Sequence, residues 1–301
     1  GRNRALDGRT PLDALCLHMV RTHLRKLRQA EPGVRDDADP DAVHDMRVAT
    51  RRLRTTLRFL EESGLFDNDA LRRQRRGLRG LARALGRARD LDVFLKRVRK
   101  YSDEQLDQDD QLAMLTKILR ARRDVARRRL LKKLRSEKVK DLLADLEAFT
   151  SRPVQFPDGQ PRPLTRHFAG SAIWRRYEEL RRFETLGPDM PAPTLHRLRI
   201  ACKRLRYTLE FFAPELGKGT QPLLTALSRA QDHLGSFQDT VVALETVTKL
   251  SHKHRGEQAL LSYCNALEAE QGELRDGFGP IWSDLCDPSF AQELAELIAG
   301  L

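Results

Sequence analysis

Two stretches of the sequence, about 150 residues apart, contain nearly the same order of residue types. Residues 43–54 are VHDMRVATRRLR and residues 195–206 are LHRLRIACKRLR, so one histidine, four basic positions and one leucine coincide at an offset of 152. A weaker correspondence joins residues 85–95 (LGRARDLDVFL) to residues 234–244 (LGSFQDTVVAL) at an offset of 149. Because the two offsets nearly agree, the order of helices and the lengths of loops should agree too. The sequence therefore predicts two copies of a four-helix unit.

Turn-forming residues divide the chain of 301 residues into segments with helical periodicity, and no segment alternates as a β-strand does. The prediction is an all-α fold of long antiparallel helices, with the first helix closed at Pro32-Gly33 and a break at 214–219. Helices are expected at residues 11–30, 41–62, 68–100, 104–135, 138–149, 166–186, 194–213, 221–250 and 256–283.

Residues 151–165 contain four prolines and one glycine, a composition typical of a linker. We expect a single domain at 8–299, and the linker separates its two halves. The predicted parts are a first helical bundle at 8–150, the linker at 151–165 and a second helical bundle at 166–299.

The expected helix at 41–62 has two distinct faces when each residue is turned by about 100°. One narrow face is apolar and should point into a bundle core; it carries Met46, Ala49, Leu53, Leu57 and Leu60. The other is a cationic stripe spaced alternately three and four residues apart, and it contains His44, Arg47, Arg51, Arg54 and Arg58.

Similar cationic stripes occur on other expected helices. In the second copy the stripe ends at Glu210 and contains His196, Arg199, Lys203 and Arg206. The first helix has His18, Arg21, Arg25 and Arg28, and the third has Arg72, Arg76, Arg79, Arg83 and Arg87. Neighbouring like charges on a helix repel by roughly 0.2–0.5 kcal/mol per pair. Stripes that are rarely interleaved with glutamate therefore predict an anionic partner, although a solvated arginine-rich face remains the alternative.

The charge is concentrated in the first half of the chain. Residues 1–150 hold 37 Lys and Arg against 24 Asp and Glu, a net charge of +13, whereas the remaining 18 and 19 give −1. A strongly basic half is typical of proteins that bind nucleic acid, a phosphate polymer or a membrane surface.

At these residues the sequence resembles the CHAD family, the conserved histidine α-helical domain. The resemblance is carried by residues 44–54 and 195–207, extended by residues 85–93, and covers roughly residues 10–285. It implies two four-helix bundles related by pseudo-twofold symmetry, with basic helix faces that meet at a central groove or pore. It also implies non-catalytic binding of inorganic polyphosphate and association with polyphosphate granules in the cytoplasm.

The expected phosphate contacts are the stripe residues. The resemblance assigns this role to His44, Arg47, Arg51, Arg54, His196, Arg199, Lys203 and Arg206, and the stripes add Arg58, His18, Arg21, Arg25, Arg28, Arg76, Arg79 and Arg83. Arg52 and Arg204 match the motif but lie about 80° from the histidine, so packing and a place at the pore rim both stay open. The helix at 256–283 departs from the family pattern, because Glu268, Glu270 and Glu273 outnumber its one arginine, Arg275. Fewer contacts are therefore expected from the second bundle.

The sequence gives no support for catalysis, a cofactor or a metal. Gly217-Lys218-Gly219-Thr220 lacks the spacing of a P-loop, and His252 and His254 would lie on different faces of a helix. The four cysteines form no C-x-x-C pair, which fits a reducing cytoplasm, and no apolar run could span a bilayer. Two alternatives stay open: a nucleic-acid-binding helical protein, disfavoured by the few aromatic residues, and a helical adaptor without a polyanion. The sequence does not specify protein partners.

Overall fold

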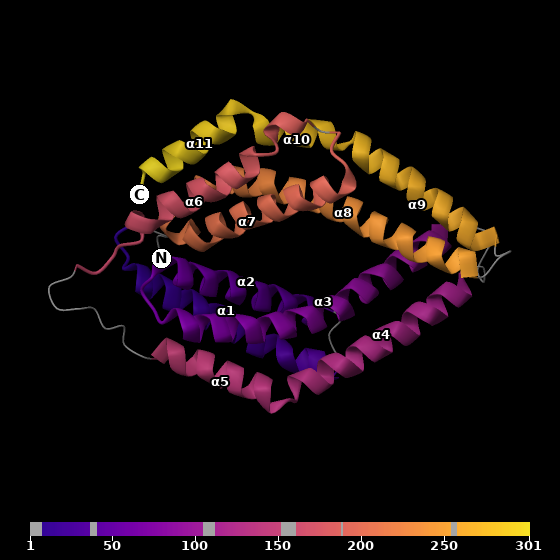
Figure 1. Ribbon diagram of the computed structural model, residues 1–301, viewed down its shortest axis with the longest axis horizontal. Coiled ribbons are helices and arrows are strands. Elements are labelled where there is room, and N and C mark those ends of the chain that lie inside the picture. The colour runs from indigo at the N-terminus through magenta and orange to yellow at the C-terminus, as the bar shows by residue number, and fades with distance from the viewer. Residues whose placement is uncertain (1–7, 37–40, 105–111, 152–160, 188, 254–257) are drawn as a thin grey trace. The chain divides into compact units, whose positions relative to one another are not determined.

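The computed structural model describes residues 8–36, 41–104, 112–151, 161–187, 189–253 and 258–301 (Figure 1). Nearly all of that part of the chain is helical and it contains no β-strand, which confirms the predicted all-α fold. The chain divides into two compact units. We call Pro11–Pro163 the N-terminal bundle; Leu164–Leu301, together with residues 8–10, is the C-terminal bundle.

The described part of the N-terminal bundle contains five helices in a meander, each of the first four packed on the next, with α5 turned back over α1 and α3 (Figure 1). Gly77 of α3 permits this, because a Cβ there would lie 2.9 Å from Leu142 of α5. The helices are α1 (Leu12–Asp36), α2 (Ala42–Ser63), α3 (Asn68–Glu104), α4 (Ala113–Leu134) and α5 (Glu137–Ser151).

The C-terminal bundle has the same meander and then a longer tail. Helix α7 packs on α6 and α8, α8 packs on α9, and the last two helices return over α8 (Figure 1). Residues 8–10, which the prediction placed with the first bundle, bond to the start of this unit: Thr165 donates its N–H to the Thr10 carbonyl at 2.9 Å. The elements are α6 (Arg166–Arg181), the 3₁₀ helix η1 (Glu184–Leu186), α7 (Ala192–Leu216), α8 (Thr220–Lys253), α9 (Gln258–Asp276), α10 (Phe278–Cys286) and α11 (Pro288–Ala299).

The apolar face predicted for the second helix lies in the core. Met46, Leu53 and Leu57 of α2 have no exposed surface, and burial of each such side chain contributes roughly 1.5–3 kcal/mol. Leu198, Leu205 and Leu209 hold the same position in α7. The core therefore fixes the rotation of both helices, and with it the direction in which their cationic stripes point.

The first helix does not end near residue 30 as predicted, because α1 continues through Pro32 and Gly33 to Asp36. A proline removes one backbone hydrogen bond from a helix, but side chains hold the next turn. Val34 is fully buried, Arg35 donates to Glu31 at 3.1 Å, and Arg127 of α4 donates to the Val34 carbonyl at 3.2 Å. Tertiary contacts override the local signal.

Three boundaries in the second half also differ from prediction. The helix expected at 166–186 ends at Arg181, and the one expected at 256–283 is divided at Gly277 into α9 and α10. Helix α7 passes Pro214 and ends at Leu216, inside the expected break. Helix α11 was not predicted; its N-terminus is capped by Asp287, whose carboxylate accepts from the Ser289 N–H at 2.8 Å. The predicted linker falls mostly on residues 152–160, outside the described residues.

Candidate functional site

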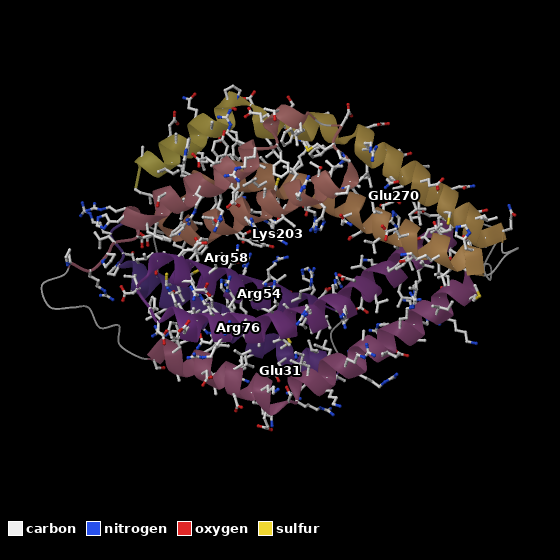
Figure 2. All side chains as sticks on the ribbon, in the orientation of Figure 1. Glu31, Arg54, Arg58, Arg76, Lys203 and Glu270 are labelled. Atoms are coloured by element: carbon white, nitrogen blue, oxygen red, sulfur yellow. The ribbon has the colours of Figure 1, made fainter. Side chains whose placement is uncertain are left out.

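The α2 stripe points toward α3. His44, Arg51 and Arg54 are each half-buried at the edge of the α2–α3 contact, and Figure 2 labels Arg54 and Arg58 on α2 with Arg76 on α3 in the same bundle. The two helices run antiparallel, so the start of α2 faces the middle of α3 and the end of α2 faces its beginning. His44 and Arg54 therefore have neighbours on α3 that a helical wheel of α2 alone does not reveal.

Those neighbours are themselves cationic. Burial lowers the pKa of the Arg54 guanidinium, and the positive charges of Arg79 and Arg75 lower it further. Burial also lowers the pKa of His44, and the charge of Arg89 is the next largest cause. Two helices thus bring like charges together along their shared edge.

Carboxylates neutralise this edge only in part. Glu61 pairs with Arg75 at 2.9 Å near the end of α2. In the described part of the chain, Arg47, Arg54 and Arg79 have no ion pair. We call this set the N-terminal seam; it consists of His44, Arg47, Arg51, Arg54 and Arg58 on α2 with Arg75, Arg79 and Arg89 on α3.

The α7 stripe has the same geometry against α8 but meets neutral groups. His196 Nδ1 lies 2.9 Å from Gln238 Oε1, and Arg206 donates to the Ser228 hydroxyl at 2.8 Å. Since an amide oxygen only accepts, His196 carries its hydrogen on Nδ1 in this contact. Arg206 also has Glu210 at 3.5 Å on its own helix.

Gly235 makes room for the remaining arginine of the motif. The Nε and Nη2 atoms of Arg199 lie 3.5 Å from the position that a Cβ would take at residue 235. The guanidinium therefore lies directly against α8 at this glycine. We call this set the C-terminal seam; it consists of His196, Arg199, Lys203 and Arg206 on α7 with Ser228, Gly235 and Gln238 on α8.

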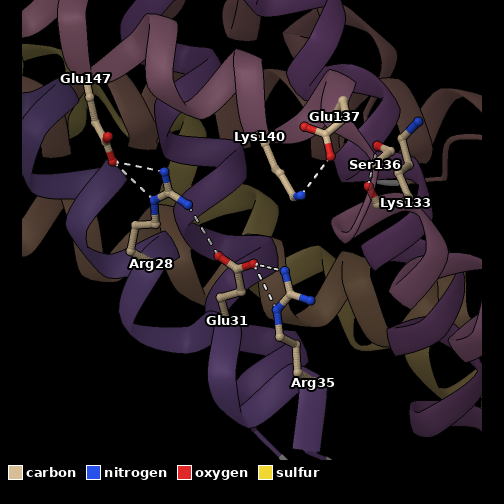
Figure 3. Close-up of polar contacts among 8 residues, drawn as sticks. All are labelled: Arg28, Glu31, Arg35, Lys133, Ser136, Glu137, Lys140 and Glu147. Atoms are coloured by element: carbon tan, nitrogen blue, oxygen red, sulfur yellow. Dashed lines mark hydrogen bonds and ion pairs between the residues drawn. The ribbon is translucent and has the colours of Figure 1, made fainter.

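The α1 stripe faces α5 and is partly neutralised. Arg28 pairs with Glu147 of α5 at 3.1 Å and with Glu31 at 3.7 Å (Figure 3). Arg21 donates to the Thr150 carbonyl. His18 and Arg25 are exposed. The structure therefore places this stripe on another side of α1–α2 than the N-terminal seam and gives it internal anions.

The α3 stripe overlaps the seam only in part. Arg79 lies beside Arg54. Arg76 and Arg83 are exposed and lie about 40–60° further round the helix than Arg79. Arg72 pairs with Asp69 at 3.6 Å.

The sequence analysis did not identify four members of the seams, Arg75, Arg89, Ser228 and Gln238. Arg89 and Gln238 belong to the weaker repeated motif, which could have indicated them.

The two motif arginines outside the stripes each lie beside a neighbouring helix. Arg204 of α7 bonds to Glu179 of α6 at 3.2 Å. Arg52 of α2 lies beside His23 of α1, whose side chain is 4% exposed. Burial, followed by the charge of Arg52, lowers the pKa of His23 to about 4, so this imidazole is neutral near pH 7.

No group of three or more His, Cys, Asp or Glu side chains is placed to hold a metal in the described ranges. None of the helices found there combines the length and the apolar character needed to cross a bilayer.

Three comparisons identify what the chain is similar to. The model of the CHAD domain matches residues 18–248. Two uncharacterised proteins, from two strains of Mycobacterium tuberculosis, are 31% identical over 236 residues. The match covers 75% of this chain but only 43% of either protein, so the chain spans less than half the length of these relatives.

Solved structures agree with this assignment. The crystal structure of the CHAD domain from the plant Ricinus communis has a TM-score of 0.68 and 26% identity, covering 98% of this chain and 95% of that one. PptA from Streptomyces chartreusis also has a TM-score of 0.68, over 92% of this chain and 99% of PptA; at 16% identity it supports the fold alone. With the family model matching well over half of its residues, the chain belongs to the CHAD family.

Proposed function

We propose that the protein binds inorganic polyphosphate without catalysis, mainly through the N-terminal seam. The observation that carries the proposal is the seam itself, where Arg54 and Arg79 lie together without a carboxylate partner in the described residues. Holding the half-buried Arg54 guanidinium beside the exposed Arg79 is unfavourable unless a counter-anion joins them. The association of the CHAD family with polyphosphate supports this choice of anion.

The chemistry of the seam suits a linear phosphate polymer. Guanidinium groups bind phosphate oxygens in pairs and keep their charge at any physiological pH. Stripe residues recur about every 5 Å along a helix, so a flexible chain with roughly one negative charge per unit can follow them. We further propose that the C-terminal seam is a weaker contact surface for the same ligand, and that binding brings the protein to polyphosphate granules in the cytoplasm.

Titration with polyphosphates of defined length tests the proposal. Fluorescence anisotropy in a series of salt concentrations should show affinity that falls steeply as salt rises, as expected when bound cations are released. Single-stranded DNA should compete weakly at equal phosphate concentration, because few aromatic side chains are available for base stacking. Displacement of polyphosphate by DNA at equal phosphate would overturn the choice of ligand in favour of nucleic acid.

A further inference from the structure

A groove of about 640 Å³ lies between α3 and α4 of the N-terminal bundle, apart from both seams. Its floor is apolar and consists of small or branched side chains: Ala84 and Leu91 from α3, with Val125 and Ala126 from α4. Val125 has 37% of its surface exposed, one of few large apolar side chains in the described residues to reach that level. An apolar floor open to solvent offers area that a partner's apolar side chains can bury.

The rim of the groove is cationic on both sides. Arg87 comes from α3, while Arg122 and Arg129 lie one turn before and after Val125 on α4. None of these three arginines has an ion pair among the residues that the structure describes. Asp90 also lines the groove and has an interaction of its own. From Arg122 to Arg129 the groove follows about 10 Å of helix, or two turns.

The C-terminal bundle fills the position that corresponds to the groove floor. The weaker repeated motif aligns Leu85-Gly86 with Leu234-Gly235, so Ala84 corresponds to His233. His233 Nε2 lies 2.6 Å from the Leu274 carbonyl of α9, and its ring stacks on Phe278 of α10 with centroids 5.9 Å apart. An imidazole and a phenyl ring therefore occupy the space that an alanine leaves open in the N-terminal bundle.

Polyphosphate has no apolar group, so the proposed function does not account for this floor. A bilayer would meet protruding apolar residues rather than a recess between two helices. An amphipathic helix fits both features, since apolar side chains three and four residues apart enter the recess and flanking carboxylates reach the arginines. We propose that the α3–α4 groove docks an acidic amphipathic helix of a partner protein.

The test uses a fluorescein-labelled helical peptide of Leu, Glu and Ala, with leucines at alternating spacings of three and four, and a scrambled peptide of the same composition. Anisotropy is measured with the full chain. We expect Arg122→Glu/Arg129→Glu to weaken binding of the patterned peptide more than tenfold. The matched control is Arg120→Glu/Arg128→Glu, which makes the same change of charge at exposed positions of α4 outside the groove, and it should weaken binding less than threefold.

A second variant fills the groove without adding negative charge. Ala84→His installs the residue found in the C-terminal bundle and should also weaken peptide binding more than tenfold, with an unchanged melting temperature as the folding control. Equal binding of the scrambled peptide would overturn the proposal, because charge alone would then explain the affinity. Displacement of the peptide by tripolyphosphate at equal charge, or binding of phosphatidylserine vesicles but not of the peptide, would overturn it as well.

Discussion

The two seams share a motif and differ in what faces it. On α2 the stripe meets Arg79 and Arg89, whereas on α7 the corresponding positions of α8 are Ser228 and Gln238. In the first arrangement Arg54 and Arg79 lie beside other cations and have no ion pair among the described residues. In the second, His196 and Arg206 meet the neutral groups of Gln238 and Ser228, and Arg206 also has Glu210 on its own helix. The motif by itself therefore does not determine how strongly a helix pair attracts an anion; the facing helix decides that.

Charge reversal in each seam should give the largest difference in polyphosphate affinity between the two seams. Arg47→Glu/Arg54→Glu should reduce affinity for polyphosphate at least about 100-fold, because two charge-assisted contacts of roughly 1.5–3 kcal/mol each are lost. The matched pair Arg199→Glu/Arg206→Glu should cost about tenfold or less, since Arg206 already bonds to Ser228 and Glu210. Anisotropy titrations give both constants. Equal losses would show that the facing helix is irrelevant.

Placing arginines on α8 where α3 has them should make the C-terminal seam bind polyphosphate more like the N-terminal seam. Ser228→Arg/Gln238→Arg gives α8 the cations that α3 has at the corresponding positions, and we expect affinity for polyphosphate to rise about three- to tenfold. The melting temperature without ligand should fall by a few degrees because like charges now meet along α7–α8. A variant with reduced affinity would contradict this explanation. Ser236→Arg, an exposed change on α8 outside the seam, is the control.

A smaller effect concerns His44 and pH. Burial and the charge of Arg89 lower the pKa of His44 below 6.5 in the unbound protein. The neutral ring is therefore favoured, and the folded protein binds less proton at His44 than the unfolded chain does. The stability that depends on neutral His44 is complete above about pH 6.5 and declines as the pH falls toward the lowered pKa. Bound polyphosphate should raise this pKa, which NMR titration of the His44 ring can follow.

That pKa shift has a consequence for binding. Since the complex takes up a proton at His44, affinity should increase by a few-fold between pH 8 and pH 6. The variant His44→Gln should remove most of this dependence and leave affinity at pH 8 nearly unchanged. A pKa of His44 that stays constant on saturation with polyphosphate would mean that the ring does not contact the ligand.

Helical periodicity predicted most of the fold because each helix buries a continuous apolar face. Leu53 and Leu205 lie in the core where the pattern placed them. The exceptions are positions where distant contacts override local signals. Pro32 lies inside α1 because Val34 is buried, and the Gly277–Pro280 segment begins a new helix because Phe278 and Trp282 enter the core.

The sequence predicted which face of each single helix is cationic, but not which residues of other helices lie beside that face. The wheel of one helix identifies the direction of Arg54, but Arg79 becomes its neighbour only through the antiparallel alignment of α2 and α3. The same limit explains the α1 stripe, whose spacing resembles that of α2 although Glu147, far along the chain, neutralises Arg28. Charge patterns thus predict which face is cationic, and tertiary packing determines whether that charge is available.

One variant tests whether the N-terminal seam is held ready for an anion. Arg54→Gln removes a half-buried charge that faces Arg75 and Arg79, so the melting temperature without ligand should rise by about 1–2 °C while affinity for polyphosphate falls about tenfold. The control Arg73→Gln, at an exposed position of α3, should change neither. If Arg54→Gln lowers the melting temperature and leaves the affinity intact, Arg54 is a structural residue and the seam is not the binding site.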